Sequence, residues 1–103
     1  SMMKHTGAVL LWAKDGDEAI RICRSNSTIS LILMDLMMPK LDGFETTRQI
    51  RTFRPQLPII AQTAFYEDNG REIAMKAGCD DYITKPIQQS DLVLLINQLV
   101  KKR

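Results

Sequence analysis

The sequence is poor in the residues that metal centres and disulfide scaffolds require. It has one histidine, His5, and two cysteines, Cys23 and Cys79, which lie far apart in the chain. The cysteines match no metal-binding or redox spacing, so we interpret them as buried thiols of a protein in a reducing compartment. Because His5 is the only imidazole, zinc chemistry is nearly excluded.

Long apolar runs and an excess of charge of one sign are missing as well. The longest apolar runs, 8–13 and 31–34, fall far short of the ~18 residues that span a bilayer, so no membrane insertion is expected. The 14 Lys and Arg residues against 12 Asp and Glu give a net charge of +2, which is too little for direct nucleic-acid binding. A chain of 103 residues that is 45% hydrophobic suits one soluble domain with its own core.

The order of apolar and polar segments predicts four strands that alternate with four helices. The strands are expected at 8–13, 29–34, 57–62 and 81–84, and the helices at 18–25, 44–54, 68–77 and 90–99. Asp15 or Asp17 is expected to cap the first helix, and Gly78 to end the third in a left-handed conformation. The strand at 29–34 is apolar on both faces, as strands of buried parallel sheets are. The sequence therefore predicts an α/β fold, a parallel sheet with helices on both faces.

Three residues that can bind or accept a phosphoryl group stand at the ends of predicted strands. Asp35, Thr63 and Lys85 should lie close together, because the carboxyl ends of parallel strands meet at one edge of the sheet. The Asp35 carboxylate can attack phosphorus to give an acyl phosphate, the Thr63 hydroxyl can donate to a phosphoryl oxygen, and the Lys85 ammonium can neutralise charge. Taken singly, each also has an ordinary role, as a turn residue, a structural hydroxyl or a solvated lysine.

The segments around these residues are similar to those of a known family. Residues 34–43, MDLMMPKLDG, closely resemble the phosphorylation loop of response regulator receiver domains of two-component systems. The resemblance continues through 62–64 (QTA), 77–78 (AG) and 81–86 (DYITKP), and back to 15–19 (DGDEA). It therefore covers nearly the whole chain.

The resemblance implies a flavodoxin-like sheet with strand order 2-1-3-4-5 and assigns roles to individual residues. It makes Asp35 the phosphoacceptor, Thr63 the switch hydroxyl and Lys85 the lysine that contacts the phosphoryl group. It also makes Tyr82 the switch aromatic, a residue whose position in the sequence fits a core side chain equally well.

The same resemblance implies Mg²⁺ as cofactor, held by Asp35, the backbone carbonyl of Met37 and an acidic pair after the family's first strand. This sequence begins at what matches the second strand, so the first strand, its helix and the acidic pair are expected to be absent. Asp15 and Asp17 are expected to be helix caps and not replacements for the pair, and His5 is a poor ligand for a hard cation. Mg²⁺ binding and Mg²⁺-dependent phosphorylation are therefore expected to be weak or absent.

We interpret residues 1–103 as one truncated receiver domain. Residues 1–7 are expected to be a tag remnant with the residual tail of a helix or linker, and 8–103 to run from the second strand to the fifth helix. Because the family's first strand is the central one, its absence would leave strand edges open. We expect the chain to compensate by dimerising, by swapping elements or by pairing its second and third strands directly.

The predicted function is that of a phosphorelay receiver, not an enzyme, that takes a phosphoryl group from a histidine kinase or a phosphotransfer protein. Two alternatives stay open: a phosphorylation-independent interaction module, and a haloacid-dehalogenase-like phosphatase, which needs a second aspartate where Met37 stands. The parent is either a stand-alone regulator or a hybrid histidine kinase, and segments 58–64 and 77–86 resemble the hybrid-kinase type. A cytoplasmic location is expected, either for the whole protein or as the cytoplasmic part of a membrane-bound kinase.

Overall fold

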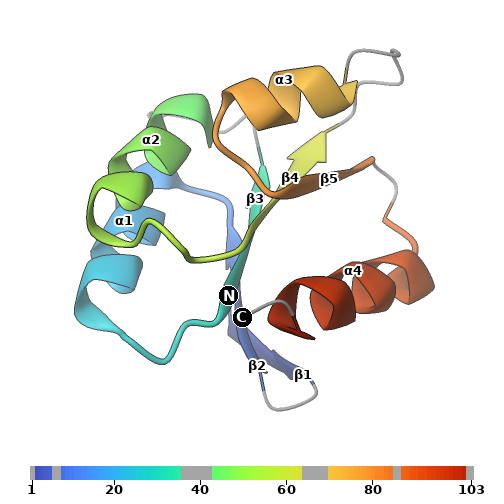
Figure 1. Cartoon of the computed structure of the whole chain (residues 1–103). Helices are drawn as coiled ribbons and strands as arrows, with labels where there is room; N and C mark the ends of the chain where they lie inside the picture. The colour runs from blue at the N-terminus through green and yellow to red at the C-terminus, as the bar shows by residue number, and fades with distance from the viewer. Residues whose placement is uncertain (1, 6–7, 36–42, 64–69, 85–86, 102–103) are drawn as a thin grey trace.

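The chain folds into a five-stranded sheet with helices on both faces (Figure 1). The computed structural model describes residues 2–5, 8–35, 43–63, 70–84 and 87–101. The elements in chain order are β1 (Met2–His5), β2 (Ala8–Ala13), α1 (Gly16–Ser25), β3 (Leu31–Asp35), α2 (Gly43–Phe53), β4 (Ile59–Thr63), α3 (Gly70–Lys76), β5 (Asp81–Thr84) and α4 (Gln89–Lys101). From β2 onward, each element lies where the sequence predicts it, apart from small shifts at its ends.

The strands are ordered β1-β2-β3-β4-β5 across the sheet. Strands β2 to β5 are all parallel, and helices α1, α2 and α3 provide the crossover connections that parallel neighbours need. The first four residues of β3, residues 31–34, are fully buried, which confirms that both faces of the sheet are covered. The predicted α/β fold with a parallel sheet is therefore confirmed.

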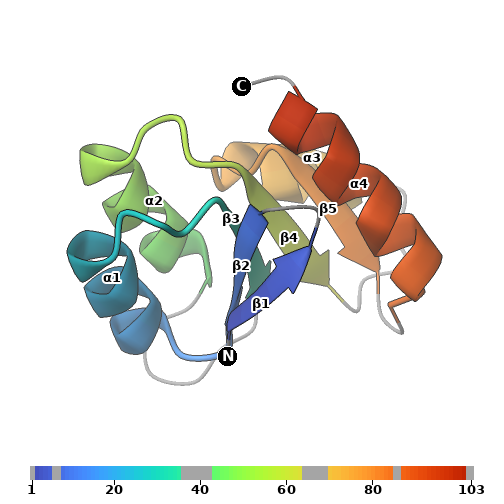
Figure 2. The same cartoon turned by 90° about the horizontal axis from the view of Figure 1, so that it is seen from below.

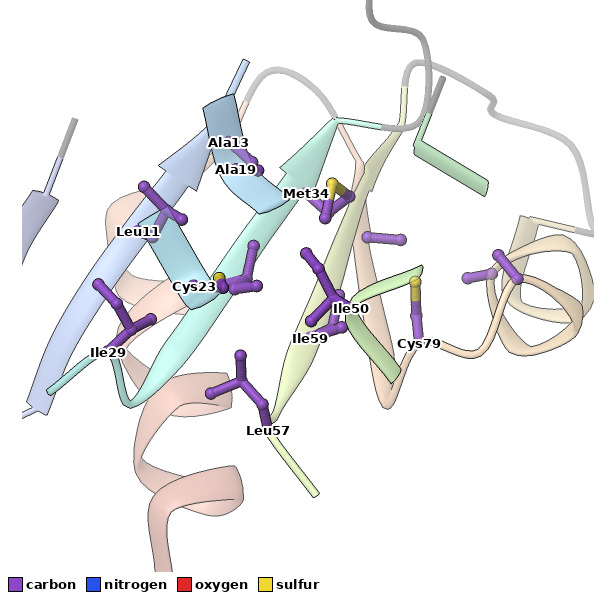
Figure 3. Close-up of a cluster of buried hydrophobic side chains, with 14 residues drawn as sticks. Leu11, Ala13, Ala19, Cys23, Ile29, Met34, Ile50, Leu57, Ile59 and Cys79 are labelled. Carbon is purple, nitrogen blue, oxygen red and sulfur yellow. The ribbon is translucent and has the colours of Figure 1, made fainter. Parts of the chain in front are cut away.

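Two hydrophobic clusters fill the space between the sheet and the helices. Helices α1, α2 and α3 lie on one face, and α4 lies on the opposite face (Figures 1 and 2). The cluster under the three helices, shown in Figure 3, comprises Leu11, Ala13, Ala19, Cys23, Ile29, Ile32, Met34, Ile50, Leu57, Ile59, Ala61, Ala74, Ala77 and Cys79. The cluster under α4 comprises Leu10, Leu31, Leu33, Ile60, Ile83, Ile96 and Leu99.

At the amino end, residues 1–7 are expected to be a tag remnant with the residual tail of a helix or linker, whereas the described residues 2–5 form a strand. Residues Met2–His5 form β1, which pairs antiparallel with β2 from Met2 opposite Leu11 to His5 opposite Ala8. The physical reason is the outer edge of β2, whose backbone groups would otherwise lack partners within the sheet.

Strand β2 lies directly beside β3, with Leu10 opposite Leu31 and Ala13 opposite Met34. No strand stands between them in the described sheet, so the order 2-1-3-4-5 implied by the resemblance is not the order seen here. Of the three ways in which the chain was expected to compensate, the structure shows the direct pairing of these two strands within one chain. The pairing is possible because both edges carry apolar, β-forming residues.

Two local predictions are confirmed by the backbone geometry. The Asp15 carboxylate caps α1 by accepting the backbone N–H groups of Asp17 at 3.0 Å and Glu18 at 3.4 Å. Gly78, after α3, has φ of +95°, which only glycine adopts without strain. This turn brings the chain from α3 into β5.

Candidate functional site

The carboxyl ends of the parallel strands place two of the predicted site residues, Asp35 and Thr63, at one edge of the sheet. Asp35 is the last residue of β3 and is paired in register with Gln62 of β4. Thr63 is the last residue of β4 and is paired with Thr84, which ends β5. The structure therefore brings the backbone positions of Asp35 and Thr63 together on neighbouring strands, as the sequence predicts.

Lys85 and Met37 lie outside the residues that the structure describes. Thr84, the residue before Lys85 in the sequence, is the last described residue of β5 and the register partner of Thr63. Their predicted roles, contact with a phosphoryl group and a carbonyl ligand for a metal, stay predictions.

Asp35 is half-buried and lies on the face of the sheet that α4 covers. The two preceding side chains that point to this face, Leu31 and Leu33, are 0% exposed and belong to the cluster under α4. Because successive side chains of a strand alternate between faces, Asp35 continues their row to the edge of the core. The Asp35 side chain therefore lies at the boundary between the hydrophobic core and solvent.

Tyr82 lies on β5 and packs, half-buried, against the cluster on the opposite face. The guanidinium carbon of Arg71 on α3 stands 5.2 Å from the centre of its ring, within the range of a cation–π contact. Arg71 also pairs with the Asp81 carboxylate at 3.5 Å. The aromatic ring predicted to act as a switch is therefore linked to α3 and not to the α4 side of the sheet.

Trp12 and Gln62 are site-edge residues that the sequence analysis missed. The indole Nε1–H of Trp12 donates to Gln62 Oε1 at 2.9 Å, although the two residues are 50 positions apart. The Lys14 ammonium lies 4.8 Å from the centre of the Trp12 ring. The only signal in the sequence was a lone tryptophan at the end of an apolar strand, which by itself indicates no partner.

The described residues do not fit a magnesium site. No group of three or more histidine, cysteine, aspartate or glutamate side chains that could hold a metal occurs among them. Asp15, the nearest carboxylate after β2, caps α1, as expected. Mg²⁺ prefers several oxygen ligands in near-octahedral geometry, and Asp35 alone among the described carboxylates ends a strand of the parallel sheet.

The two cysteines are free and buried. Burial raises the pKa of both the Cys23 and the Cys79 thiol from 9.0 to about 11. Both thiols are therefore protonated at neutral pH, which makes them unreactive and poor metal ligands. This confirms that they are buried thiols.

None of the helices in the described part of the chain has the length and apolar character needed to cross a membrane.

Comparison with known proteins places the chain among receiver domains. The family model for the response regulator receiver domain matches residues 1–97. The transcriptional regulatory protein ResD of Bacillus subtilis is 43% identical over 90 residues, which cover 87% of this chain and 37% of ResD. The alkaline phosphatase synthesis transcriptional regulatory protein PhoP of the same organism is 30% identical over 100 residues, 97% of this chain and 41% of PhoP. The chain thus spans about two fifths of the length of these curated relatives.

Solved receiver structures share the fold. The receiver domain of the Francisella response regulator 1452 has a TM-score of 0.77 and 33% identity, over 87% of this chain and 74% of that one. The receiver domain of the sensor histidine kinase PA1611 from Pseudomonas aeruginosa, with a magnesium ion coordinated in its active site cleft, has a TM-score of 0.75 and 34% identity. That match covers 86% of this chain and 74% of the PA1611 domain.

Proposed function

Because this chain belongs to the response regulator receiver domain family of two-component systems, we propose that Asp35 is its phosphoryl acceptor. The observation that supports the proposal most strongly is the position of Asp35, a half-buried carboxylate at the carboxyl end of β3, beside β4. Ligand chemistry in open parallel sheets occurs at this edge. An aspartate at this edge has buried apolar side chains on one side and solvent on the other.

The proposed reaction transfers a phosphoryl group from a phosphohistidine to Asp35. A carboxylate oxygen attacks phosphorus, so that a P–O bond forms while the P–N bond of the phosphohistidine breaks. The electron pair of that bond stays on the imidazole nitrogen, which takes up a proton. The product is an acyl phosphate, which carries about −1.5 to −2 charges at the edge of the sheet in place of the single charge of the carboxylate.

Thr63, Lys85 and Tyr82 have supporting roles in this proposal. Thr63 donates its hydroxyl to a phosphoryl oxygen, and Lys85 neutralises the added charge. The place of Thr63 at the end of the strand beside Asp35 supports the first role. Tyr82, linked to Arg71 on α3, passes the change on to α3 and β5 as a shift between two populations.

Receiver domains bind Mg²⁺ in their active sites, and we propose that this chain binds it weakly. The described carboxylates form no group of three, and Asp15 is engaged as a helix cap. Asp35 and the carbonyl of Met37 are, by themselves, a poor ligand set for a hard cation. Phosphorylation that depends on Mg²⁺ is then slow.

Receiver domains interact with histidine kinases or phosphotransfer proteins, and we propose such a protein as the donor for this chain. The transcriptional regulatory proteins PhoP and ResD are longer than this chain. If the parent protein is a stand-alone regulator, we propose that it carries an output domain. The 34% identity to the receiver domain of a sensor histidine kinase supports the hybrid-kinase parent. Self-association and a cytoplasmic location stay predictions.

Two other functions remain as alternatives to phosphoryl acceptance. The lack of a metal-ligand group among the described carboxylates favours an interaction module that works without phosphorylation. A haloacid-dehalogenase-like phosphatase would need a general acid two residues after Asp35, where the sequence has Met37.

The proposal is tested by incubating the chain with acetyl phosphate and Mg²⁺ and following its intact mass. The wild type is expected to gain one phosphoryl group slowly, and the Asp35→Asn variant none. Asp91→Asn, which removes an exposed carboxylate on α4, serves as the matched control and should react like the wild type. Equal phosphorylation of the Asp35→Asn variant refutes the acceptor role.

The Mg²⁺ part of the proposal has a separate test. A chain extended at its amino end by the first strand and helix of a receiver domain should react much faster than the chain itself. Rapid, Mg²⁺-dependent phosphorylation of the unextended chain contradicts weak binding. A steady release of inorganic phosphate from phosphate monoesters would instead favour the phosphatase.

A further inference from the structure

A hydrogen bond between side chains crosses β3 immediately beside Asp35. Trp12 on β2 donates its indole N–H to Gln62 on β4 at 2.9 Å. Strand β3 lies between these two strands, as Figure 2 shows, so the two side chains together span roughly 10 Å of sheet. Such a bond can form only when both side chains lie on the same face of the sheet.

The strand register fixes where this bond crosses β3. Trp12 is paired with Leu33, and Gln62 is paired with Asp35. Leu33 and Asp35 are two residues apart on β3, so their side chains point to the same face. This is also the face on which Trp12 packs against the cluster under α4. The Trp12–Gln62 bond therefore passes over β3 between Leu33 and Asp35, on the inner side of the carboxylate.

The bond also fixes the orientation of the Gln62 amide. Gln62 is 6% exposed, so its amide has little water to bond with. Because its Oε1 accepts the indole N–H, a half-turn of the amide would set two donors against each other. With Oε1 bonded to Trp12, the Nε2 group of Gln62 is the part of the amide that can donate a hydrogen bond to a nearby anion. A fixed donor beside the place where negative charge gathers stabilises that charge without reorganisation.

We infer that Gln62, held by Trp12, is a positioning residue for Asp35. In this inference, Trp12 and Gln62 block the side of the Asp35 carboxylate that faces the core, so that the carboxylate points toward the edge of the sheet. The Gln62 amide also provides a hydrogen-bond donor for the negative charge on the carboxylate or on the phosphoryl group. This inference rests on the proposed role of Asp35 as phosphoryl acceptor. It assigns a function to the one indole of the chain and to the buried amide of Gln62.

The first test needs no phosphoryl transfer. Trp12 is the only tryptophan, so a ¹⁵N-labelled chain gives one indole N–H signal in a two-dimensional NMR spectrum. Replacing Asp35→Asn should shift this signal, since the strand register puts the bridge beside Asp35. The control Asp91→Asn, which removes an exposed carboxylate on α4, should leave it in place. An indole signal that does not respond to Asp35→Asn overturns the inference.

The second test separates positioning from structural support. Gln62→Leu removes both the acceptor for Trp12 and the donor, while Gln62→Glu keeps an acceptor oxygen and removes the donor. Both variants should take up a phosphoryl group from acetyl phosphate roughly tenfold more slowly than the wild type. Gln62→Glu should keep the indole signal near its wild-type position, which shows that the bridge and the fold are intact. Gln56→Leu, an exposed residue before β4, is the control and should react at the wild-type rate.

The outcomes distinguish this inference from the proposed function. Wild-type rates for both Gln62 variants overturn the positioning role and leave Asp35 as acceptor. Uptake by the Asp35→Asn variant equal to that of the wild type refutes the acceptor role itself. A slow Gln62→Glu variant with an unchanged indole signal supports the inference when Gln62→Leu, which adds no charge, is slow as well. A merely structural role predicts normal reactivity once the bridge is kept, and charge repulsion alone predicts slowing only for Gln62→Glu.

Discussion

Arg51 and Asp80 tie the end of α2 to the turn that leads into β5. Arg51 Nη2 lies 2.8 Å from Asp80 Oδ2, and that same oxygen accepts the backbone N–H of Ile59 at 2.8 Å. The guanidinium also donates to the carbonyl oxygen of Gly78 at 2.9 and 3.1 Å and to that of Pro55 at 3.2 Å. One arginine thus joins α2, the start of β4 and the turn after α3.

Replacing Arg51→Met should lower the free energy of unfolding by about 2 kcal/mol, because carbonyl oxygens and a carboxylate lose a charged donor. Arg48→Met is the matched control, since Arg48 pairs with Glu45 on the exposed face of α2. Exposed pairs of this kind contribute about 0–1 kcal/mol. Urea unfolding measures both variants, and equal losses would show that the Arg51 contacts stabilise no more than a surface pair.

Gly78→Ala should destabilise the fold by about 1 kcal/mol, because φ of +95° is strained for a residue with a Cβ. The new methyl would meet no close neighbour, since its nearest contact is Thr47 Cγ2 at 3.5 Å. The cost is therefore one of backbone conformation and not of a clash. Gly78→Asn should cost less, as asparagine tolerates left-handed conformations. Thermal unfolding compares the two variants, and a larger loss for asparagine would point to crowding instead.

The stability of the fold should decrease in alkaline solution, partly through Cys79. Burial raises the pKa of this thiol from 9.0 in the unfolded chain to about 11 in the folded one. The stabilisation from the neutral, buried thiol is complete below pH 9 and is lost as the pH rises through about 11, because only the unfolded chain ionises readily in between. Urea unfolding across this range should show a steeper decrease for the wild type than for Cys79→Ala. Parallel decreases would contradict the shift.

Only the face of α4 that packs against the sheet should contribute to the free energy of unfolding. Ile96 is 4% exposed and belongs to the cluster under α4, whereas Leu94 on the same helix is 60% exposed. Ile96→Ala should cost about 3 kcal/mol, and Leu94→Ala should change the free energy of unfolding by less than about 0.5 kcal/mol. Denaturant titration of the two variants checks the assignment. A similar cost for both would place a partner over Leu94 in solution.

Much of the fold could be predicted because its signals are local. The apolar run at 31–34 and its abrupt end at Asp35 indicate a doubly buried strand whose last side chain reaches the edge of a parallel sheet. The Asp15 cap and the left-handed Gly78 follow from the chemistry of helix ends. Similar signals place Thr63 at the end of the next strand.

The neighbours of each strand could not be predicted in the same way. Residues Met2–His5 show no strand pattern strong enough to be recognised, and they form β1 because the open edge of β2 offers them partners. The direct pairing of β2 with β3 stood as one of three possibilities. The alternation of apolar and polar residues along a strand predicts which face of the sheet each side chain occupies. It does not predict which strand lies beside it.

The sequence by itself determined the class of the fold, the strand ends and the acceptor candidate, because periodicity, helix caps and the residues at strand ends depend on near neighbours. Only the tertiary structure decided that β2 stands beside β3 and that Trp12 therefore reaches Gln62 next to Asp35. Contacts between residues 50 positions apart depend on how strands are ordered in the sheet. The order of the strands depends on how the whole chain buries its apolar surface in a single fold. A local sequence pattern does not contain that information.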